Sequence, residues 1–284
     1  MGLLTGLGIL YVSACGLVYS QQRQLIFKPS RGVDVTPAQI QLDYEEVWIA
    51  VPTDGNEAQR IHGWWIPAQD PKGTLLYLHG NGFNIAANLG LAQRFHRQGL
   101  SVLLIDYRGY GNSDGDFPSE EWVYDDAEAA WSYLRNDRHI PAEKIVVFGH
   151  SLGGAIAIDL VRKHPNAAGI IVQSSFSSMQ DLAQLQGWPR VFPLDLLLTQ
   201  RFDSMAKVAK LVPPKLLIHG SADALIPVAM SQQLYDASAE PKTIQVIAGA
   251  GHNNVAEVGG DRYDQLVAKF VTQTLLEDRA PALR

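Results

Sequence analysis

The stretch Ile145-Val146-Val147-Phe148-Gly149-His150-Ser151-Leu152-Gly153 joins an apolar run to a G-x-S-x-G sequence, and the following segment 152–164 has a helical composition. G-x-S-x-G between a strand and a helix is typical of a nucleophile elbow, a turn so tight that glycine is needed on both sides of the serine. The sequence therefore predicts that Ser151 lies on strained backbone at the carboxyl edge of a sheet. The first amides of the helix would then point at the reacting centre. The alternative is an ordinary strand-to-helix turn.

Short apolar runs recur along the rest of the chain, at 74–78, 102–105, 168–172, 216–218 and 244–247. Stretches of helical composition alternate with them, at 85–98, 119–135, 228–237 and 263–276. Continuous apolar runs suit strands buried on both faces of a parallel sheet, and the alternation implies right-handed β-α-β units. Upstream, 45–51 and 60–66 flank a turn at 52–56 and indicate an antiparallel pair at a sheet edge. The sequence therefore predicts an α/β fold with a mostly parallel, doubly wound sheet of eight strands.

The alternation breaks between residues 174 and 212. This interval is rich in large apolar residues, namely Phe176, Met179, Leu182, Leu185, Trp188, Phe192 and the run 196–198. A structureless loop of this length is uncommon in a compact domain. We therefore expect two short helices that form a small cap over the carboxyl edge of the sheet and favour an apolar substrate group. The alternative is an additional packing layer that never touches a substrate.

A serine nucleophile needs a base and an acid that orients the base. Asp223 lies just past the run 216–218, and His252 lies just past the run 244–247. Because the loops at the carboxyl ends of parallel strands converge, both residues can reach Ser151. In this interpretation His252 takes and returns the Ser151 proton, while Asp223 holds the imidazole in one tautomer. The alternatives are a turn residue for Asp223 and a core histidine for His252.

A tetrahedral intermediate needs two hydrogen-bond donors for its oxygen. One is expected to be the backbone N–H of Leu152, the residue after the nucleophile. The other is expected in the loop His79-Gly80-Asn81-Gly82-Phe83-Asn84, where glycine lets the backbone approach the oxyanion closely. Asn81 is the preferred donor, and Gly82 is the alternative.

These motifs resemble those of the α/β-hydrolases, which carry nucleophile, acid and base in the order serine, aspartate, histidine. The matching residues are His79 to Gly82, Asp106-Tyr107-Arg108-Gly109-Tyr110-Gly111-Asn112-Ser113, Gly149 to Gly154, the Asp223 loop and Gly251-His252. Within that family the chain resembles the Bem46-like group, related to membrane-anchored hydrolases that remove palmitoyl groups from proteins. The likeness runs from about Gln24 to Leu276, and Phe83 departs from the pattern of the group at a place where it could shape the acyl site.

The resemblance implies the α/β-hydrolase fold, with Ser151, Asp223 and His252 as the catalytic residues. It also implies structural roles for His79 and for the loop 106–113, in which Asp106 and Arg108 are expected to hold one another. The remaining histidines outside these motifs have no spacing that suggests a metal, and neither a metal nor a cofactor is expected.

The composition agrees with a globular enzyme. The chain has 284 residues, 46% of them hydrophobic and 18% charged, which is enough for a sizeable core. Its formal net charge of −6, without a block of Lys or Arg, argues against a nucleic-acid partner. Cys15 is the only cysteine, so neither an internal disulfide nor a cysteine metal site can form.

The N-terminal segment from Gly2 to Ser20 contains no charged residue. As a helix its 19 residues would extend roughly 28 Å, close to the thickness of a bilayer core. We therefore predict a single-pass signal anchor at 1–23, followed by a hydrolase domain at 24–284 with a cap insertion at 174–212. The alternatives are a cleaved secretory signal and a lipid-modified Cys15, although no Lys or Arg precedes the apolar run.

The orientation in the membrane follows from the basic residues that come after the apolar run. Arg23, Lys28 and Arg31 favour a cytoplasmic location of the C-terminal domain. Taken together, the sequence predicts a membrane-anchored serine hydrolase that cleaves carboxylic esters or thioesters through an acyl-enzyme. Its substrate would be a small or lipid-like acyl compound or an acylated protein. The alternatives are a serine peptidase of the same fold and a catalytically inactive hydrolase-like binding module.

Overall fold

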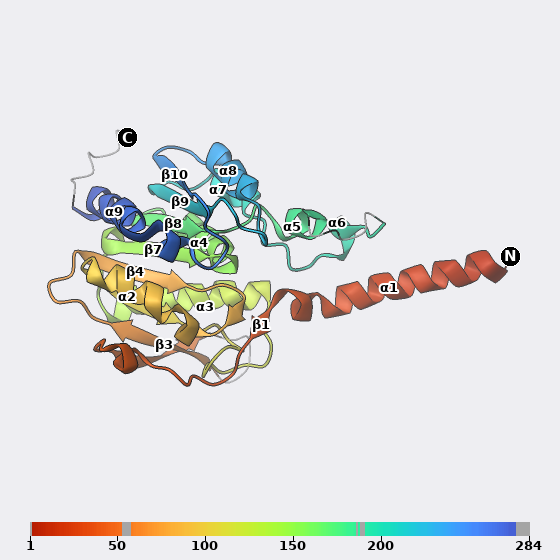
Figure 1. The fold of residues 1–284 in the computed structure, drawn as a ribbon. Coiled ribbons are helices and arrows are strands. Elements are labelled where there is room, and N and C mark those ends of the chain that lie inside the picture. Colours follow the sequence, from red (N-terminus) through yellow and green to blue (C-terminus); the bar gives the residue numbers. More distant parts are fainter. Residues whose placement is uncertain (1, 53–57, 186, 188–190, 277–284) are drawn as a thin grey trace.

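A computed structural model describes residues 2–52, 58–185, 187 and 191–276 of the chain. Within these ranges the main sheet has eight strands in the order β10-β9-β8-β7-β4-β6-β3-β2 (Figure 1). The strands are β2 (Glu45–Val51), β3 (Gln59–Ile66), β4 (Gly73–Leu78), β6 (Leu100–Ile105), β7 (Ile145–His150), β8 (Gly169–Gln173), β9 (Lys215–Gly220) and β10 (Lys242–Ile247).

Strands β4 and β6 to β10 run parallel to one another, whereas β3 is antiparallel to both of its neighbours, β2 and β6. All eight predicted strands are present, most of them one or two residues longer than their apolar runs. The turn expected at 52–56 lies, apart from Pro52, outside the described residues. The predicted mostly parallel sheet is confirmed.

Helices cover both faces of the sheet (Figure 1). They are α2 (Leu89–Arg97), α3 (Glu120–Ser132), α4 (Leu152–Lys163), α8 (Val228–Ala237) and α9 (Val255–Leu275). Side chains of α3, α4 and α8 join one apolar core cluster, and side chains of α2 and α9 join the other. Alternate residues of β7 supply both, since Val147 faces the first cluster while Val146 and Phe148 face the second. The sheet is therefore doubly wound, as predicted.

Two helices differ at their N-terminal ends from the predicted ranges. Helix α9 begins at Val255 rather than Tyr263 and bends at Gly260, whose φ of 49° breaks the helical geometry. Helix α2 is preceded by a 3₁₀ turn at Ile85–Asn88 that fills the first part of the predicted segment. The prediction therefore began α2 too early and α9 too late.

The interval predicted as a cap contains three short helices among its described residues. They are α5 (Met179–Leu185), α6 (Leu194–Leu197) and α7 (Met205–Val208). Helix α7 packs on α4 and α8, whereas α5 and α6 extend away from the sheet, where α6 contacts the N-terminal helix (Figure 1). Trp188, expected to belong to the cap, lies outside the described residues.

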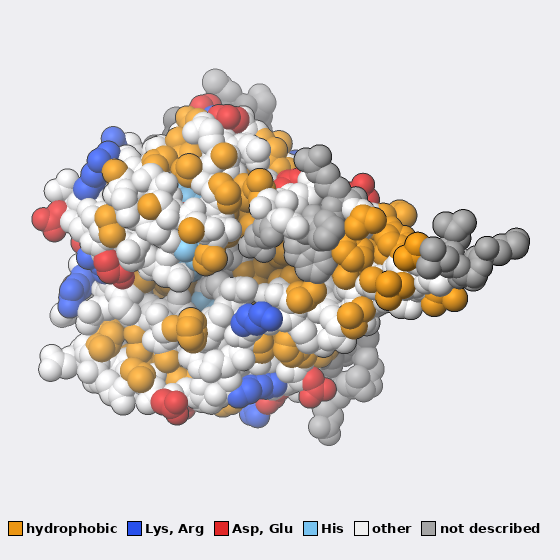
Figure 2. All heavy atoms as spheres, turned by 45° about the vertical axis from the view of Figure 1, so that its right-hand side comes forward, with side chains coloured by type: hydrophobic (Ala, Val, Ile, Leu, Met, Phe, Trp, Pro, Cys, Tyr) orange, Lys and Arg blue, Asp and Glu red, His pale blue; other side chains and the backbone are white. Residues whose placement is uncertain are grey.

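The N-terminal helix α1 (Gly2–Ile26) is longer than the predicted apolar run and projects from the body of the molecule (Figure 1). Exposed apolar side chains gather on this projecting arm, among them Leu7, Leu10 and Val12 (Figure 2). None of the helices in the described ranges combines the length and the apolar character needed to cross a membrane. The predicted membrane-spanning anchor is thus not supported among the described residues. At the far end of α1, Gln22 and Arg23 bond to the domain.

Directly after α1 in the chain, a short strand forms a pairing that the sequence did not indicate. Strand β1 (Lys28–Pro29) lies parallel to β5 (Gly82–Phe83), with Lys28 opposite Gly82. Because β5 belongs to the loop after β4, this pairing ties the end of α1 to the loop beside Ser151.

Candidate active site

Ser151 lies at the sharp turn between β7 and α4. Its backbone has φ 55° and ψ −119°, in a region that non-glycine residues rarely occupy. A Cβ atom at Gly149 would lie 2.2 Å from the carbonyl oxygen of Gly153, and one at Gly153 would lie 2.1 Å from that of Leu78. Both glycines are therefore required by close backbone contacts. The strained turn is held by the Ser151 N–H, which donates to the carbonyl of Gln173 at 2.9 Å.

The structure brings the three predicted catalytic residues together. Nε2 of His252 lies 3.0 Å from Oγ of Ser151, and Nδ1 of His252 lies 2.7 Å from Oδ2 of Asp223. Asp223 follows β9 and His252 follows β10, so both reach Ser151 from the same edge of the parallel sheet. This chain of contacts can pass the Ser151 proton to an imidazole that a carboxylate orients.

The Asp223 carboxylate has further donors. Its Oδ1 accepts from the amides of Leu225 and Ile226, each at 2.9 Å, and its Oδ2 lies 3.2 Å from Nε2 of His219. Burial by itself would raise the pKa of Asp223. The hydrogen bonds from His219, His252 and the Ile226 amide outweigh it and hold this pKa well below the usual range. Asp223 is thus ionised wherever His252 needs a negative partner.

His219 is a functional candidate that the sequence analysis did not single out. The imidazole is fully buried at the end of β9. Its Nε2 lies 2.8 Å from the carbonyl of Ile226, which can only accept, so this nitrogen carries the proton that also faces Asp223. Its Nδ1 then accepts from the Ser231 hydroxyl at 2.7 Å. The sequence did hold one signal for His219, namely a polar side chain at the end of an otherwise apolar strand.

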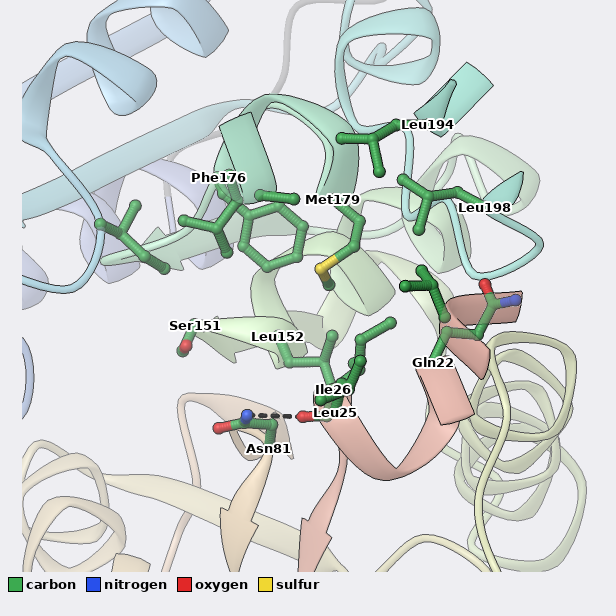
Figure 3. Close-up of a pocket in the computed structure, with 14 residues that line it drawn as sticks. Gln22, Leu25, Ile26, Asn81, Ser151, Leu152, Phe176, Met179, Leu194 and Leu198 are labelled. Carbon is green, nitrogen blue, oxygen red and sulfur yellow. Dashed lines mark hydrogen bonds between the residues drawn. The ribbon is translucent and has the colours of Figure 1, made fainter. Parts of the chain in front are cut away.

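Asn81 and Leu152 line the cap pocket together with Ser151, so their backbone amides are the candidate oxyanion donors. The Leu152 amide is the first of α4, where amides have no acceptor within the helix. In the described part of the chain the Asn81 amide has no hydrogen-bond acceptor either. The Asn81 side chain is engaged elsewhere, because its Nδ2 donates to the carbonyl of Ile26 at 2.7 Å (Figure 3). The backbone amide of Asn81, rather than its side chain, is therefore the candidate donor to an oxyanion.

Ser151 lies between two hollows of different chemistry. The first, here called the cap pocket, encloses about 160 Å³ and is lined mainly by apolar side chains of α1, the cap and Ile226 (Figure 3). The second, here called the loop cleft, encloses about 460 Å³ and includes Asn88, His150, Asn253 and Glu257 beside His252. A substrate carbonyl at Ser151 would place its two substituents in these two environments.

His150, the neighbour of the nucleophile, is a histidine of a different kind from His252. Its ring lies 5.1 Å from the His252 ring, centroid to centroid, and its Nε2 is 3.2 Å from the His252 carbonyl oxygen. Burial, reinforced by the neighbouring His252, lowers the pKa of His150 to about 4. His150 is therefore neutral across the pH range in which an ordinary histidine titrates.

The loop 106–113 supports the site, but its charges pair differently from the expectation. Arg108 Nε lies 2.6 Å from Oδ1 of buried Asp126 on α3, and the Arg108 amide donates to the other oxygen at 2.8 Å. Asp106 instead accepts from the Ile85 amide at 2.9 Å and lies 3.5 Å from Nε2 of His79. The prediction that Asp106 and Arg108 hold one another is wrong, because Arg108 turns toward α3 and Asp106 toward the loop after β4.

Metal ligation has no candidate in the described ranges, where no group of three or more His, Cys, Asp or Glu side chains could hold an ion.

Comparison with known proteins identifies the family of this chain. The family model described as "Serine aminopeptidase, S33" matches residues 69–202. The chain belongs to the α/β-hydrolase family, within the group that includes bem46. It is 33% identical over 259 residues to an uncharacterized protein of Mycobacterium tuberculosis, covering 90% of this chain and 89% of the relative. Protein bem46 of Schizosaccharomyces pombe is 29% identical over 278 residues, covering 92% and 89%.

Among solved structures, an esterase of Pyrococcus furiosus superposes with a TM-score of 0.71 and 20% identity, covering 88% of this chain and 98% of the esterase. This likeness shows the shared fold. The resemblance inferred from the motifs is confirmed, and the protein is a hydrolase by family.

Proposed function

We propose that this hydrolase cleaves carboxylic esters or thioesters of apolar acyl groups through an acyl-enzyme on Ser151. The observation that carries the proposal is the position of Ser151 Oγ, 3.0 Å from His252 Nε2 and at the wall of the apolar cap pocket. A nucleophile with its base in place and an apolar cavity beside it suits an acyl group whose chain avoids water.

The chemistry follows from these positions. Ser151 Oγ attacks the carbonyl carbon while His252 Nε2 accepts its proton, and the amides of Asn81 and Leu152 stabilise the oxyanion. His252 then gives the proton to the leaving alcohol or thiol, which departs and leaves the acyl group bonded to Ser151. Water, deprotonated by His252, attacks this ester and releases the carboxylic acid, which restores Ser151. None of these steps needs a cofactor.

Each of the two hollows would bind one half of the substrate. The acyl chain enters the cap pocket, whose volume of about 160 Å³ is close to that of an apolar cavity of about 150 Å³ that holds the six carbons of benzene. The leaving group occupies the loop cleft, where polar groups meet it. An ester or thioester of a short acyl group fits this division, and the first carbons of a longer lipid-like chain or of the acyl group on a protein would enter the same pocket.

A peptidase activity is the second candidate, since the matching family is described as serine aminopeptidases. An aminopeptidase must hold the cationic amino group of its substrate, which calls for a carboxylate near the nucleophile. Among the described residues that line the cap pocket, none is an Asp or Glu. Glu257 lines the loop cleft instead, and the ester hypothesis therefore has the stronger support.

The decisive experiment combines a fluorophosphonate probe with p-nitrophenyl esters of two to twelve carbons. We expect the probe to label the wild-type chain and not Ser151→Ala, and we expect kcat/KM to rise up to about six carbons and then level off. Each methylene that enters the pocket contributes about 0.8 kcal/mol, so two methylenes raise kcat/KM about tenfold.

The controls separate the alternatives. Alanine p-nitroanilide tests the peptidase, and faster turnover of this amide than of hexanoate ester would replace the proposed function. Ser177→Ala serves as the matched serine control, because this buried serine bonds to Asp181 rather than to the triad. Absence of labelling in the folded wild-type chain would indicate the inactive binding module.

A further inference from the structure

One face of the N-terminal helix borders the same cavity as the nucleophile. Val18, Gln22, Leu25 and Ile26 of α1 line the cap pocket together with Ser151. Their spacing of four, three and one residues places them on one side of a helix. Figure 3 shows Gln22, Leu25 and Ile26 on this wall of the pocket. Leu17, on another face of α1, is exposed. The helix thus presents a defined surface to the pocket, opposite the cap residues Met179 and Leu198.

Gln22 fastens this helix to the cap. Although polar, it is only 4% exposed. Its Oε1 accepts from the amides of Thr199 and Gln200 at 2.8 and 3.1 Å, and its Nε2 donates to the Leu197 carbonyl at 3.3 Å. One side chain therefore satisfies three backbone groups of a single cap segment. Leu198, within that segment, is held against the pocket by these bonds.

Both flanks of this contact are fixed as well. Toward the start of α1, the Tyr11 hydroxyl donates to the Val191 carbonyl at 2.7 Å. At the other end, the Ile26 carbonyl accepts from Asn81, and the Lys28 amide donates to the Asn81 carbonyl at 2.9 Å. The helix is therefore joined at one end to the cap and at the other to the loop that carries the oxyanion amide.

We propose that α1 is the acyl-selecting wall of the active site, with Val18 setting the length of chain admitted and Gln22 holding the cap closed against it. This inference rests on the proposed function and deepens it. The helix is then part of the catalytic domain rather than a removable address segment, and the domain boundary expected at residue 23 cuts through the pocket.

The test changes the side chain at the pocket wall in the full chain. Val18→Trp fills the cavity, whereas Leu17→Trp places the same side chain on the exposed neighbouring position. We expect Val18→Trp to lower the ratio of kcat/KM for hexanoate over acetate esters at least tenfold while acetate is still hydrolysed. Leu17→Trp is expected to keep the wild-type ratio. Equal ratios in Val18→Trp and wild type would overturn the inference.

Two further variants keep the proposal falsifiable if Val18→Trp does not fold. Val18→Ala enlarges the cavity and is expected to move the chain length at which kcat/KM levels off beyond six carbons; an unchanged length would count against the wall. Gln22→Ala, matched by exposed Gln24→Ala, is expected to raise KM several-fold more for hexanoate than for acetate. An identical effect of the two glutamine variants would contradict the role of Gln22.

The failure of this inference can be told from failure of the proposed function. If the wild-type chain hydrolyses no ester and takes no fluorophosphonate label, the proposed function fails. If it hydrolyses esters with a chain-length profile that no change at Val18 or Gln22 alters, only the role of α1 fails.

Discussion

The side chain of Asn81 donates its hydrogen bond to the backbone carbonyl of Ile26, at 2.7 Å, and not toward Ser151. Asn81 therefore has two roles, one for its backbone and one for its side chain. Its backbone amide, which has no acceptor in the described part of the chain, is the proposed oxyanion donor, and its side-chain amide binds the last turn of the N-terminal helix. Any displacement of that helix is thereby transmitted to the loop that borders the nucleophile.

These two roles predict that Asn81→Ala has only a small effect on kcat. The variant keeps the backbone donor and loses one neutral hydrogen bond, which is worth about 1 kcal/mol, so kcat for acetate ester should fall about tenfold or less. Removing a true oxyanion donor costs a hundredfold to a thousandfold. Steady-state kinetics decide between the two, and a loss of a hundredfold or more would assign the donor to the side chain.

The pH dependence should come from one histidine. His252 must be neutral to accept the Ser151 proton, so kcat/KM should rise with pH as His252 loses its proton. His150, with its pKa lowered to about 4, is already neutral at about pH 6, and Asp223, with its pKa below the usual range, is already ionised. A pH profile of His150→Gln should therefore keep the acid limb at the same pH. A limb that moves or vanishes in this variant would implicate His150.

His219 should act as a positioning residue through Asp223. His219→Leu removes a donor to a buried carboxylate, and such a bond to a charged group is worth about 1.5 to 3 kcal/mol, so kcat should fall about tenfold or more. His219→Gln, which can still donate, should recover part of this loss. The acid limb of the pH profile should also shift to lower pH in the leucine variant. The reason is that a carboxylate whose position is no longer fixed by His219 stabilises the His252 imidazolium less. Equal activity of the two variants would leave His219 a packing residue.

The glycines of the elbow should be required for folding, in contrast to a glycine on a helix surface. In Gly153→Ala the new methyl would meet the Leu78 carbonyl at 2.1 Å, so the free energy of unfolding should fall by about 3 kcal/mol or more. Gly90→Ala in α2 meets nothing within 4 Å and should raise it by up to about 1 kcal/mol. Urea denaturation measures both. Tolerance of alanine at Gly153 would mean that the elbow can open.

Much of the fold was predictable because its signals are local. The apolar run before Gly149 and the glycines around Ser151 describe a buried strand and a tight turn within ten consecutive residues. Asp223 and His252 could be named for the same reason, since each follows its own apolar strand and parallel strands bring such loops to one edge. The prediction needed only the pattern of each segment and the rule that joins them.

The remaining features depend on which distant segments meet, and local pattern does not contain that information. The run from Gly2 to Ser20 has the composition of a membrane helix. Nothing in that composition shows that Gln22, just after the run, bonds to backbone groups of the cap 175 or more residues away. Arg108 pairs with Asp126 rather than Asp106 because α3 packs beside the loop after β6. The sequence by itself determined the sheet, the elbow and the residues of the candidate triad. Only the tertiary structure decided what encloses the nucleophile, because a pocket wall is made by contacts between segments whose sequences carry no mark of one another.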